Sequence, residues 1–391
     1  MKDKLNIALI RKKYLPEKGG TENDVTQFVN RFTAKGHHIS LFSELFMAEE
    51  NELLKWYKVP KSSMPGFCRP VAFHRQAQRM LTADRLRDSF DIIYSLCRTF
   101  PVDILRVTEQ LHTKWLPIGY SRFARLNPRH RGILKLEKRI FDSRNSKFIV
   151  VNSNFIKQQI IEEFNYPADK IRVIYNGMNH DKFFPATSDE KQAARKQINI
   201  DPKRNICLFA ATDFETKGLA EAIAVIASVK EELRNNTLLL VVGDDKSTPF
   251  IKLAEEYGVA KNIIFAGHQE NMRDYYIAAD ILLYPSRYEV FSDVCLEALG
   301  CGLPIITTRQ IGAYELIDEA VNGFSVTTSD NIEEMAHFLA AFFELPLKEK
   351  NKFSRAASDS VSDFTWRKHI NLLEELFFEV TEIKRSQMNR K

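Results

Sequence analysis

The sequence predicts an α/β protein built from two doubly wound domains, each a parallel sheet with helices on both faces. The chain has 391 residues, more than one hydrophobic core ordinarily organises. Short apolar runs alternate with amphipathic stretches through both halves of the chain. These runs are apolar at successive positions, which is typical of parallel strands covered on both faces, and the amphipathic stretches supply the covering helices.

The predicted strands fall into two sets. In the first half they occupy residues 5–10, 37–43, 91–96, 147–153 and 171–177. In the second half they occupy residues 205–212, 237–244, 262–268, 280–286, 303–308 and 323–327. Helical patterns lie between them, clearest at 21–36 and 219–236. Two such sets predict two separate domains.

The join between the domains is predicted in the stretch 175–190, which contains an Asn-Gly step and Pro185 between periodic segments. We therefore expect one domain over residues 1–180 and a second over residues 181–365. The remainder, about 366–391, is rich in Phe and Leu. It is predicted to form a helix that packs back on the first domain.

Composition narrows the class of protein. Hydrophobic residues make up 44% and charged residues 27% of the chain, as in globular domains. No apolar run reaches the roughly 18 residues needed to cross a bilayer, and the first apolar run is short and lacks a cleavage site, so no signal peptide is predicted. The five cysteines are scattered without CxxC spacing, which favours reduced thiols and a cytosolic location.

Charge is distributed unevenly along the chain. Residues 69–147 contain 17 Lys and Arg against 7 Asp and Glu, a net charge of +10, whereas the whole chain carries +5. This basic region predicts an anionic partner: phosphate, acidic lipid or nucleic acid. No nucleic-acid-binding motif is present. Arginines alternate with Phe, Leu, Met and Tyr in 69–90 and 120–132, which favours an acidic membrane surface, with an ordinary solvated helix face as the alternative.

Three strand-to-helix turns carry the candidate chemistry, because ligands of doubly wound domains bind where strands end and helices begin. Gly19 and Gly20 follow the first strand and would let backbone N–H groups approach an anion, or simply form a flexible turn. Lys217 precedes a helix in the second domain. A lysine there can neutralise a phosphate, although a solvated lysine in a first turn is the alternative.

The third turn is "YEVFSDVCLE", which places Glu289 and Glu297 on either side of a predicted helix start. Backbone N–H groups of residues 291–294 would face a diphosphate at that helix N-terminus. The two carboxylates could then accept hydrogen bonds from a ribose diol and a sugar hydroxyl. The alternative is a pair of acids favoured by the helix dipole alone. The GxGxxG, P-loop and HExxH fingerprints are absent.

This third turn resembles the signature of glycosyltransferase family 4. The family motif is two glutamates separated by seven residues, followed by A-x-x-x-G-x-P, and its matches are Glu289, Glu297, Ala298, Gly302 and Pro304. The likeness is dense over residues 145–330 and thinner before them. It implies the GT-B fold, in which two Rossmann-like domains face each other with the active site in the cleft between them. The first domain would then bind the acceptor and the second the nucleotide sugar.

The resemblance also implies roles for individual residues. Glu289, Lys217, His112 and Glu109 would form the catalytic group, with Lys217 against the diphosphate and Glu289 and His112 near the donor sugar. The donor-binding residues would be Glu297 on the ribose together with Gly19, Gly20, Phe291, Ser292, Asp293, Val294, Thr212, Asp213, Gly243 and His268. Asp103 and Arg106 would line the acceptor side.

The expected reaction is retaining transfer of a sugar from a nucleoside diphosphate to a hydroxyl group, without metal or other cofactor. Likeness to the lipopolysaccharide branch of the family implies glucose from UDP-glucose and a core heptose, or a related glycolipid, as acceptor. The basic region would hold the protein on the inner face of the cytoplasmic membrane, and no nucleic acid is expected as a partner.

The sequence departs from the family pattern at three places. Thr212 replaces the usual arginine, Phe291-Ser292-Asp293 replaces Phe-Gly, and Glu109-Gln110 replaces Asp-Gly. The second departure bears on the donor sugar and the third on the acceptor. A different donor sugar on another cell-surface glycan, and a non-catalytic scaffold that binds sugar nucleotides, are the alternatives. Epimerases and phosphorylases share the fold, but no pyridoxal phosphate lysine segment is evident.

Overall fold

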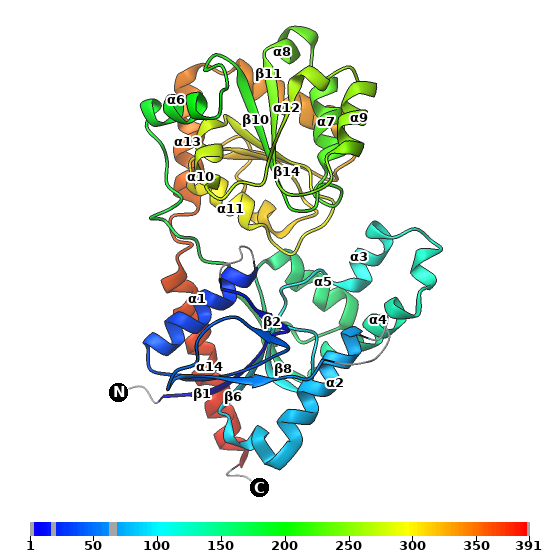
Figure 1. Cartoon of the computed structure of the whole chain (residues 1–391), viewed down its shortest axis with the longest axis vertical. Coiled ribbons are helices and arrows are strands. Elements are labelled where there is room, and N and C mark those ends of the chain that lie inside the picture. The colour runs from blue at the N-terminus through cyan, green and yellow to red at the C-terminus, as the bar shows by residue number, and fades with distance from the viewer. Residues whose placement is uncertain (1–3, 17–20, 62–68, 389–391) are drawn as a thin grey trace. The chain divides into compact units, whose positions relative to one another are not determined.

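The computed structural model describes residues 4–16, 21–61 and 69–388. The chain divides into two compact units. Unit 1 contains Met1–Gly177 and Trp366–Lys391, and unit 2 contains Met178–Thr365. The chain therefore leaves unit 1 once and returns to it for its last helix (Figure 1).

Unit 1 is built on a seven-stranded sheet in the order β5-β3-β1-β6-β7-β8-β9, in which every pair is parallel. Its strands are β1 (Asn6–Ile10), β3 (His38–Ser43), β5 (Leu54–Lys58), β6 (Ile92–Ser95), β7 (Val102–Arg106), β8 (Ser146–Val151) and β9 (Ile171–Val173). Two short strands, β2 (Lys13–Tyr14) and β4 (Leu45–Phe46), pair with each other beyond the ends of β1 and β3.

The helices of unit 1 connect these strands. They are α1 (Thr21–Ala34), α2 (Arg69–Thr82), η2 (Ala83–Ser89), α3 (His112–Gly119), η3 (Ala124–Leu126), α4 (Pro128–Ile140), α5 (Asn154–Phe164), η4 (Ala168–Lys170) and α14 (Trp366–Met388). Local chemistry starts two of them: Asn127 and Ser153 accept hydrogen bonds from the first-turn amides of α4 and α5, as N-cap residues do.

Helix α14 belongs to the core of unit 1 although it lies almost two hundred residues from the rest of that unit in sequence. Its Ile370, Leu373 and Phe377 are buried in one hydrophobic cluster with side chains of α1, β1 and β6. Phe377 contacts the rings of Phe28 and Phe32 on α1. The helix thus completes one face of the sheet.

Unit 2 is built on a six-stranded parallel sheet in the order β12-β11-β10-β13-β14-β15. Its strands are β10 (Asn205–Ala210), β11 (Thr237–Val242), β12 (Ile263–Gly267), β13 (Ile281–Tyr284), β14 (Ile305–Thr308) and β15 (Gly323–Val326). All side chains of β11, β13, β14 and β15 are buried, which explains why these runs are apolar at successive positions.

Helices cover both faces of this second sheet (Figure 1). They are α6 (Ser188–Gln197), α7 (Leu219–Ser228), α8 (Glu231–Asn235), α9 (Thr248–Glu256), η5 (Ala260–Asn262), α10 (Met272–Ala278), α11 (Asp293–Gly300), η6 (Gly312–Leu316), α12 (Ile332–Glu344) and α13 (Leu347–Ser360). A large buried cluster joins α7, α12 and the strands between them.

The predicted fold class is confirmed: both sheets are parallel and doubly wound, and all eleven predicted strands are present. The helix predicted over 219–236 is wrong in one respect, because α7 ends at Ser228 and a separate α8 follows. Strands β2, β4, β5 and β7 were missed. The four cysteines in the described part of the chain are unbridged, and no helix in that part is long and apolar enough to cross a membrane.

Candidate active site

Most of the predicted donor residues follow strands of the unit 2 sheet. Thr212 and Asp213 come directly after β10, Gly243 after β11 and His268 after β12, and Glu289 follows β13 in the loop to α11. Because the carboxyl ends of parallel strands meet at one edge of a sheet, these residues share that edge. Thr212, Asp213 and His268 are exposed there.

Lys217 and Glu289 form an ion pair at this edge. Lys217 Nζ lies 2.8 Å from Glu289 Oε1, and both side chains are largely buried. The second oxygen of Glu289 accepts a hydrogen bond from the Tyr284 hydroxyl at 3.0 Å. The carboxylate is therefore fixed from two sides, and it holds the lysine ammonium beside it.

Close backbone packing brings the Lys217 loop to the Glu289 loop. Gly218 has φ +84°, and a Cβ atom built on it would lie 2.1 Å from the carbonyl oxygen of Pro285. Only glycine allows this approach. The backbone N–H of Arg287 donates to Thr216 O at 3.1 Å, and the Arg287 guanidinium pairs with Glu221 of α7 at 2.7 Å. The two loops are thus joined on both sides of Lys217.

The N-terminus of α11 opens at the same edge. Ser292 is its N-cap residue, and its Oγ accepts from Cys295 N. Phe291 is buried beneath the turn, while Asp293 and Val294 are partly exposed. The helix dipole and the first-turn amides favour an anion at this point.

Glu297 lies inside α11, where its side chain is partly buried. Its Oε2 accepts a hydrogen bond from the Tyr276 hydroxyl at 2.9 Å. Burial, and then the charge of Asp293, raises the pKa of Glu297 to about 7, although Tyr276 and Lys182 oppose the rise. The carboxyl group can therefore change its protonation state close to neutral pH.

Gly243 has a geometric reason to be glycine. Its φ is +150°, and a Cβ atom would lie 1.8 Å from Ala211 O. The turn after β11 therefore packs directly on the turn after β10 and holds Thr212 in place. Asp213 supports the same loop, because its Oδ1 accepts from Thr216 N at 3.0 Å.

In unit 1, His112 begins α3 and is buried. Glu137 of α4 caps that helix: its oxygens accept from the backbone N–H groups of His112 at 2.8 Å and Thr113 at 3.1 Å. The His112 ring stacks on His130, with Nε2 of His112 2.9 Å from Nδ1 of His130. Burial, assisted by the Arg98 charge, lowers the pKa of His112 to about 4, so its imidazole is neutral at physiological pH.

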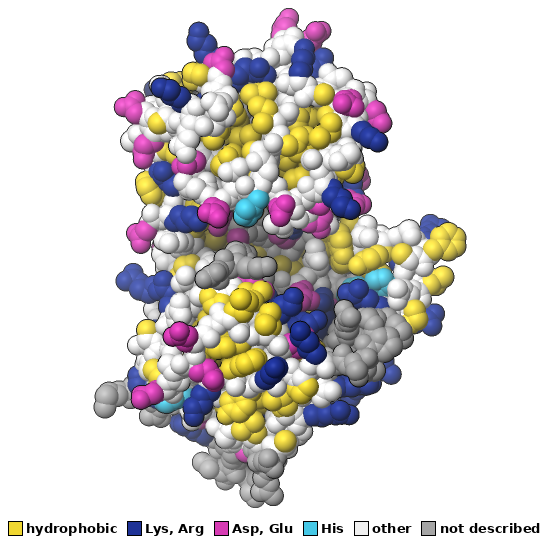
Figure 2. Space-filling model, viewed as in Figure 1, with side chains coloured by type: hydrophobic (Ala, Val, Ile, Leu, Met, Phe, Trp, Pro, Cys, Tyr) yellow, Lys and Arg dark blue, Asp and Glu magenta, His cyan; other side chains and the backbone are white. Residues whose placement is uncertain are grey.

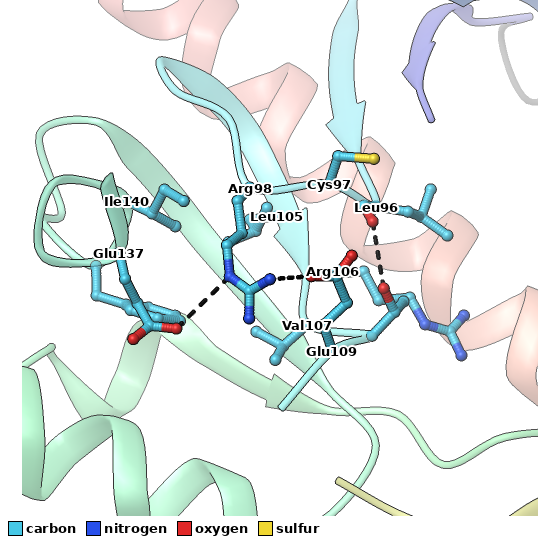
Figure 3. Close-up of a pocket in the computed structure, with 11 residues that line it drawn as sticks. Leu96, Cys97, Arg98, Leu105, Arg106, Val107, Glu109, Glu137 and Ile140 are labelled. Atoms are coloured by element: carbon cyan, nitrogen blue, oxygen red, sulfur yellow. Dashed lines mark hydrogen bonds and ion pairs between the residues drawn. The ribbon is translucent and has the colours of Figure 1, made fainter. Parts of the chain in front are cut away.

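Glu109 lies in the loop after β7 and pairs with Arg98, which follows β6 (Figure 3). Both residues line a cavity of about 30 Å³ together with Cys97, Arg106 and Glu137. Figure 3 shows the Arg98 guanidinium between the two glutamates. Glu109 and His112 are thus brought to the same carboxyl edge of the unit 1 sheet.

Asp103 is not part of that edge. It is the second residue of β7, at the amino end of the strand, and is buried. Its carboxylate accepts from Ile93 N at 2.9 Å and pairs with Lys147 at 3.0 Å and Lys384 at 2.9 Å. Its predicted role on the acceptor side is therefore not retained, because the carboxylate ties β6, β8 and α14 together.

Arg106 ends β7 but is also enclosed. Its guanidinium contacts Asp24 at 3.2 Å, Asn176 at 2.8 Å and the Nε2 atom of His369 at 2.8 Å. Burial lowers the pKa of His369 to about 3, so its neutral ring accepts from Arg106 and donates from Nδ1 to Tyr175 O. This network fastens α14 to the sheet, and we do not retain Arg106 as an acceptor ligand.

Gly19 and Gly20 lie outside the residues that the structure describes. Among residues 4–16, 21–61 and 69–388, no group of three His, Cys, Asp or Glu side chains is arranged to hold a metal ion.

A larger pocket, about 360 Å³, lies at the opposite, amino edge of the unit 2 sheet, between α6, α10 and α13. None of the predicted site residues lines it. Its charged side chains pair with each other, since Asp280 binds both Lys191 and Arg195 at 2.8 Å.

Comparison with known proteins assigns the chain to a family. The model of glycosyl transferases group 1 matches residues 190–360, and the model of Glycosyltransferase Family 4 matches residues 18–182. Together the two models span most of both units. The chain belongs to glycosyltransferase family 4. Members of this family are retaining, metal-independent hexosyltransferases that use nucleotide-sugar donors, and this chain is such an enzyme.

Individual relatives of this family 4 enzyme agree with the assignment. The lipopolysaccharide glucosyltransferase WaaG of Escherichia coli strain K12 is 26% identical over 347 residues, which cover 88% of this chain and 91% of that protein. The crystal structure of WaaG superimposes with a TM-score of 0.81 at 22% identity, over 95% of this chain and 99% of that one. Anabaena Alr3699/HepE in complex with UDP-glucose gives a TM-score of 0.69 at 16% identity, over 96% and 100%. The fold is GT-B.

Sequence reasoning missed the groups that hold the site residues. Tyr276 and Tyr284 fix the two motif glutamates. Tyr284 ends the apolar run of β13, a position that could have drawn attention to it, whereas Tyr276 lies within α10 and gives no such signal. Arg98, Glu137 and His130 surround the unit 1 residues, but their sequence spacing from His112 gives no local signal.

Proposed function

We propose that this family 4 enzyme transfers glucose from UDP-glucose to a heptose of the lipopolysaccharide core or to a related anionic glycolipid. The observation that carries the donor half of the proposal is the Lys217–Glu289 ion pair beside the N-terminus of α11. A cation and a helix N-terminus at one strand edge suit a diphosphate. A carboxylate held in the same place suits the hydroxyls of the attached sugar.

The remaining donor contacts follow from this arrangement. Glu297 accepts hydrogen bonds from the ribose diol, and the turns that carry Thr212, Asp213, Gly243 and His268 surround the nucleotide. Glucose and uridine are supported by the similarity to WaaG, which is named as a glucosyltransferase, and by the fold shared with a protein solved with UDP-glucose.

The chemistry needs no carboxylate nucleophile. The bond between the anomeric carbon and the leaving phosphate oxygen breaks, and the electron pair goes to the UDP product. Lys217 and the amides of α11 stabilise that charge. The acceptor oxygen bonds to the anomeric carbon on the face that the phosphate leaves, so configuration is retained, and the acceptor proton goes to the phosphate. In unit 1, His112 is neutral, and Arg98 holds Glu109 on the acceptor side.

The proposed attachment to an acidic membrane rests on one segment of unit 1. Between α3 and α4, Phe123 is 86% and Leu126 64% exposed. Arg122, Arg129 and Arg131 are exposed around them. Figure 2 shows hydrophobic and basic side chains together on this lobe. Apolar side chains among cations suit the interface of an anionic bilayer, which would place the enzyme on the cytoplasmic face of the inner membrane.

The first test is thermal stabilisation of the full chain by UDP, ADP and GDP and by their glucose conjugates, with EDTA present. We expect UDP and UDP-glucose to raise the melting temperature most. Lys217→Ala and Glu289→Ala should lose turnover while remaining folded, and Lys252→Ala, an exposed lysine on α9, should keep it. Full activity in either site variant would overturn the donor assignment.

A second donor sugar is favoured by one observation. Ser292 and Asp293 occupy the turn where many family members have glycine, and at the N-terminus of α11 Ser292 is buried as the N-cap residue while Asp293 is partly exposed. Preference for another UDP-sugar in the same thermal panel would identify that donor. No stabilisation by any nucleotide would instead favour a non-catalytic scaffold.

A further inference from the structure

Arg98 is held by two carboxylates that differ sharply in exposure. Its Nε lies 3.7 Å from Glu137 Oε1, and its other nitrogens contact the Glu109 carboxylate and, at 2.5 Å, the carbonyl of Gln110. The Glu137 side chain is 2% exposed, whereas that of Glu109 is 54% exposed. Of the two carboxylate partners of the Arg98 guanidinium, one is therefore buried and the other lies in solvent (Figure 3).

The buried partner cannot be exchanged. Glu137 already accepts from two backbone N–H groups at the start of α3, and its carboxylate needs the Arg98 charge because a buried unpaired charge is costly. Burial raises the pKa of Glu137 and Arg98 opposes that rise. Glu137 thus fixes the position of the Arg98 guanidinium group.

The exposed partner can be exchanged. Glu109 lies in an irregular loop, and an exposed ion pair contributes little to stability because water screens both charges. A guanidinium presents paired N–H groups that match the oxygens of a phosphate better than those of a single flexible carboxylate. An incoming phosphate would therefore replace Glu109 at small cost.

Neighbouring charges add to the attraction. Arg11 and Lys12 follow β1, the strand next to β6, and the Arg11 guanidinium donates to Leu96 O at 3.4 Å. Burial raises the pKa of Cys97, the residue before Arg98, to about 11, and the charges of Arg11 and Lys12 oppose the rise. Arg11 is itself paired with Glu22 at 3.2 Å, so Lys12 and Arg98 are the cations that contribute most at the ends of these two adjacent strands, at the edge where Glu109 and His112 lie.

We infer that Arg98 binds a phosphate group carried by the acceptor, and that Glu109 occupies the guanidinium until this phosphate arrives. This inference rests on the proposed function, since it names the chemistry by which unit 1 recognises an anionic glycolipid. It assigns to Arg98 a binding role and to Glu109 that of a competitor displaced by the correct acceptor.

The experiment titrates the full chain with inorganic phosphate against chloride at equal ionic strength and records the melting temperature. Saturating UDP is present so that phosphate cannot report on the donor site. We expect Glu109→Gln to strengthen phosphate binding about three- to tenfold by removing the competing carboxylate, and Arg98→Lys, which keeps the charge beside Glu137, to weaken it about tenfold. Arg75→Gln, an exposed arginine on α2, is the matched control and should behave as wild type.

Each outcome decides the point. Unchanged phosphate affinity in both Glu109→Gln and Arg98→Lys would overturn the inference. The role of Arg98 would then be only to pair with Glu137, which caps α3. The inference would also be overturned if the Arg98→Lys variant no longer bound vesicles of phosphatidylglycerol that the wild-type protein binds. The phosphate that Arg98 recognises would then be that of a lipid headgroup. Failure of the proposed function is seen separately, as absence of stabilisation by UDP in the wild-type protein.

Discussion

Replacing Glu297 by glutamine should stabilise the protein at alkaline pH while weakening its hold on the donor. The Glu297 carboxyl group has a pKa raised to about 7 from an ordinary value of 4.5, first by burial and then by Asp293. The neutral form is therefore favoured in the folded protein. Glutamine has the same shape without the charge, and its carbonyl can still accept from Tyr276.

The sign of the pH dependence follows from linkage. Below pH 4.5 the carboxyl group is protonated in both the folded and the unfolded chain, so it does not change the free energy of unfolding. Between pH 4.5 and about 7 the unfolded chain releases the proton and the folded chain keeps it, so stability falls as pH rises. Above pH 7 this loss of unfolding free energy is complete. The shift corresponds to about 3 kcal/mol at full burial, and we expect about 1–2 kcal/mol because the side chain still reaches solvent.

The assay is the melting temperature of wild type and Glu297→Gln from pH 5 to pH 8.5. The difference between them should be small at pH 5 and reach about 2–8 °C in favour of the variant at pH 8, at about 2–4 °C per kcal/mol for a unit of this size. Glu255→Gln, an exposed position on α9, is the control and should show no trend. A difference that does not change with pH would refute the argument. At pH 8 the same variant should bind UDP more weakly, because the ribose loses its charged acceptor.

Three further predictions test the framework around the site. Lys217→Ala should lower kcat about 10²- to 10³-fold with a smaller change in UDP affinity, measured by steady-state kinetics; a loss of UDP affinity with kcat unchanged would mean that the lysine only binds. Gly218→Ala should lower the free energy of unfolding by about 2–3 kcal/mol, because a Cβ would overlap Pro285 O. Gly258→Ala, with φ +68° and open space around it, should cost only about 1 kcal/mol, and equal losses would contradict the steric account. Asp103→Asn should lower the melting temperature and leave KM for acceptor unchanged; a raised KM with unchanged melting temperature would return this residue to the acceptor site.

The parts of the fold that the sequence predicts are those where burial leaves a local pattern. Strands β10, β11 and β13 are uninterrupted apolar runs, so each is recognisable by itself. Strand β7 was missed because Asp103 and Arg106 interrupt its apolar run. Both charges are tolerated only through partners far away in sequence, such as Lys384 and His369, which no local pattern reveals.

The candidate site divides in the same way. Glu289, Glu297 and Lys217 lie in recognisable turns, and the structure brings Glu289 and Lys217 into contact. Their supports could not be predicted, because the contact of Gly218 with Pro285 depends on how two loops pack. Asp103 illustrates the reverse. A motif match predicted that it lines the acceptor side, but it lies at the amino end of β7, where its carboxylate pairs with two lysines.

The late return of α14 to unit 1 has a consequence for how the chain is made. Residues 178–365 emerge from the ribosome before Trp366–Met388, so unit 2 can finish folding while the first sheet still lacks one of its covering helices. Until then the apolar surface that Leu373 and Phe377 cover in the finished protein stays open to water. A premature stop within this last helix would therefore leave unit 2 intact and expose the interior of unit 1, which should make such a product a target for chaperones and proteases.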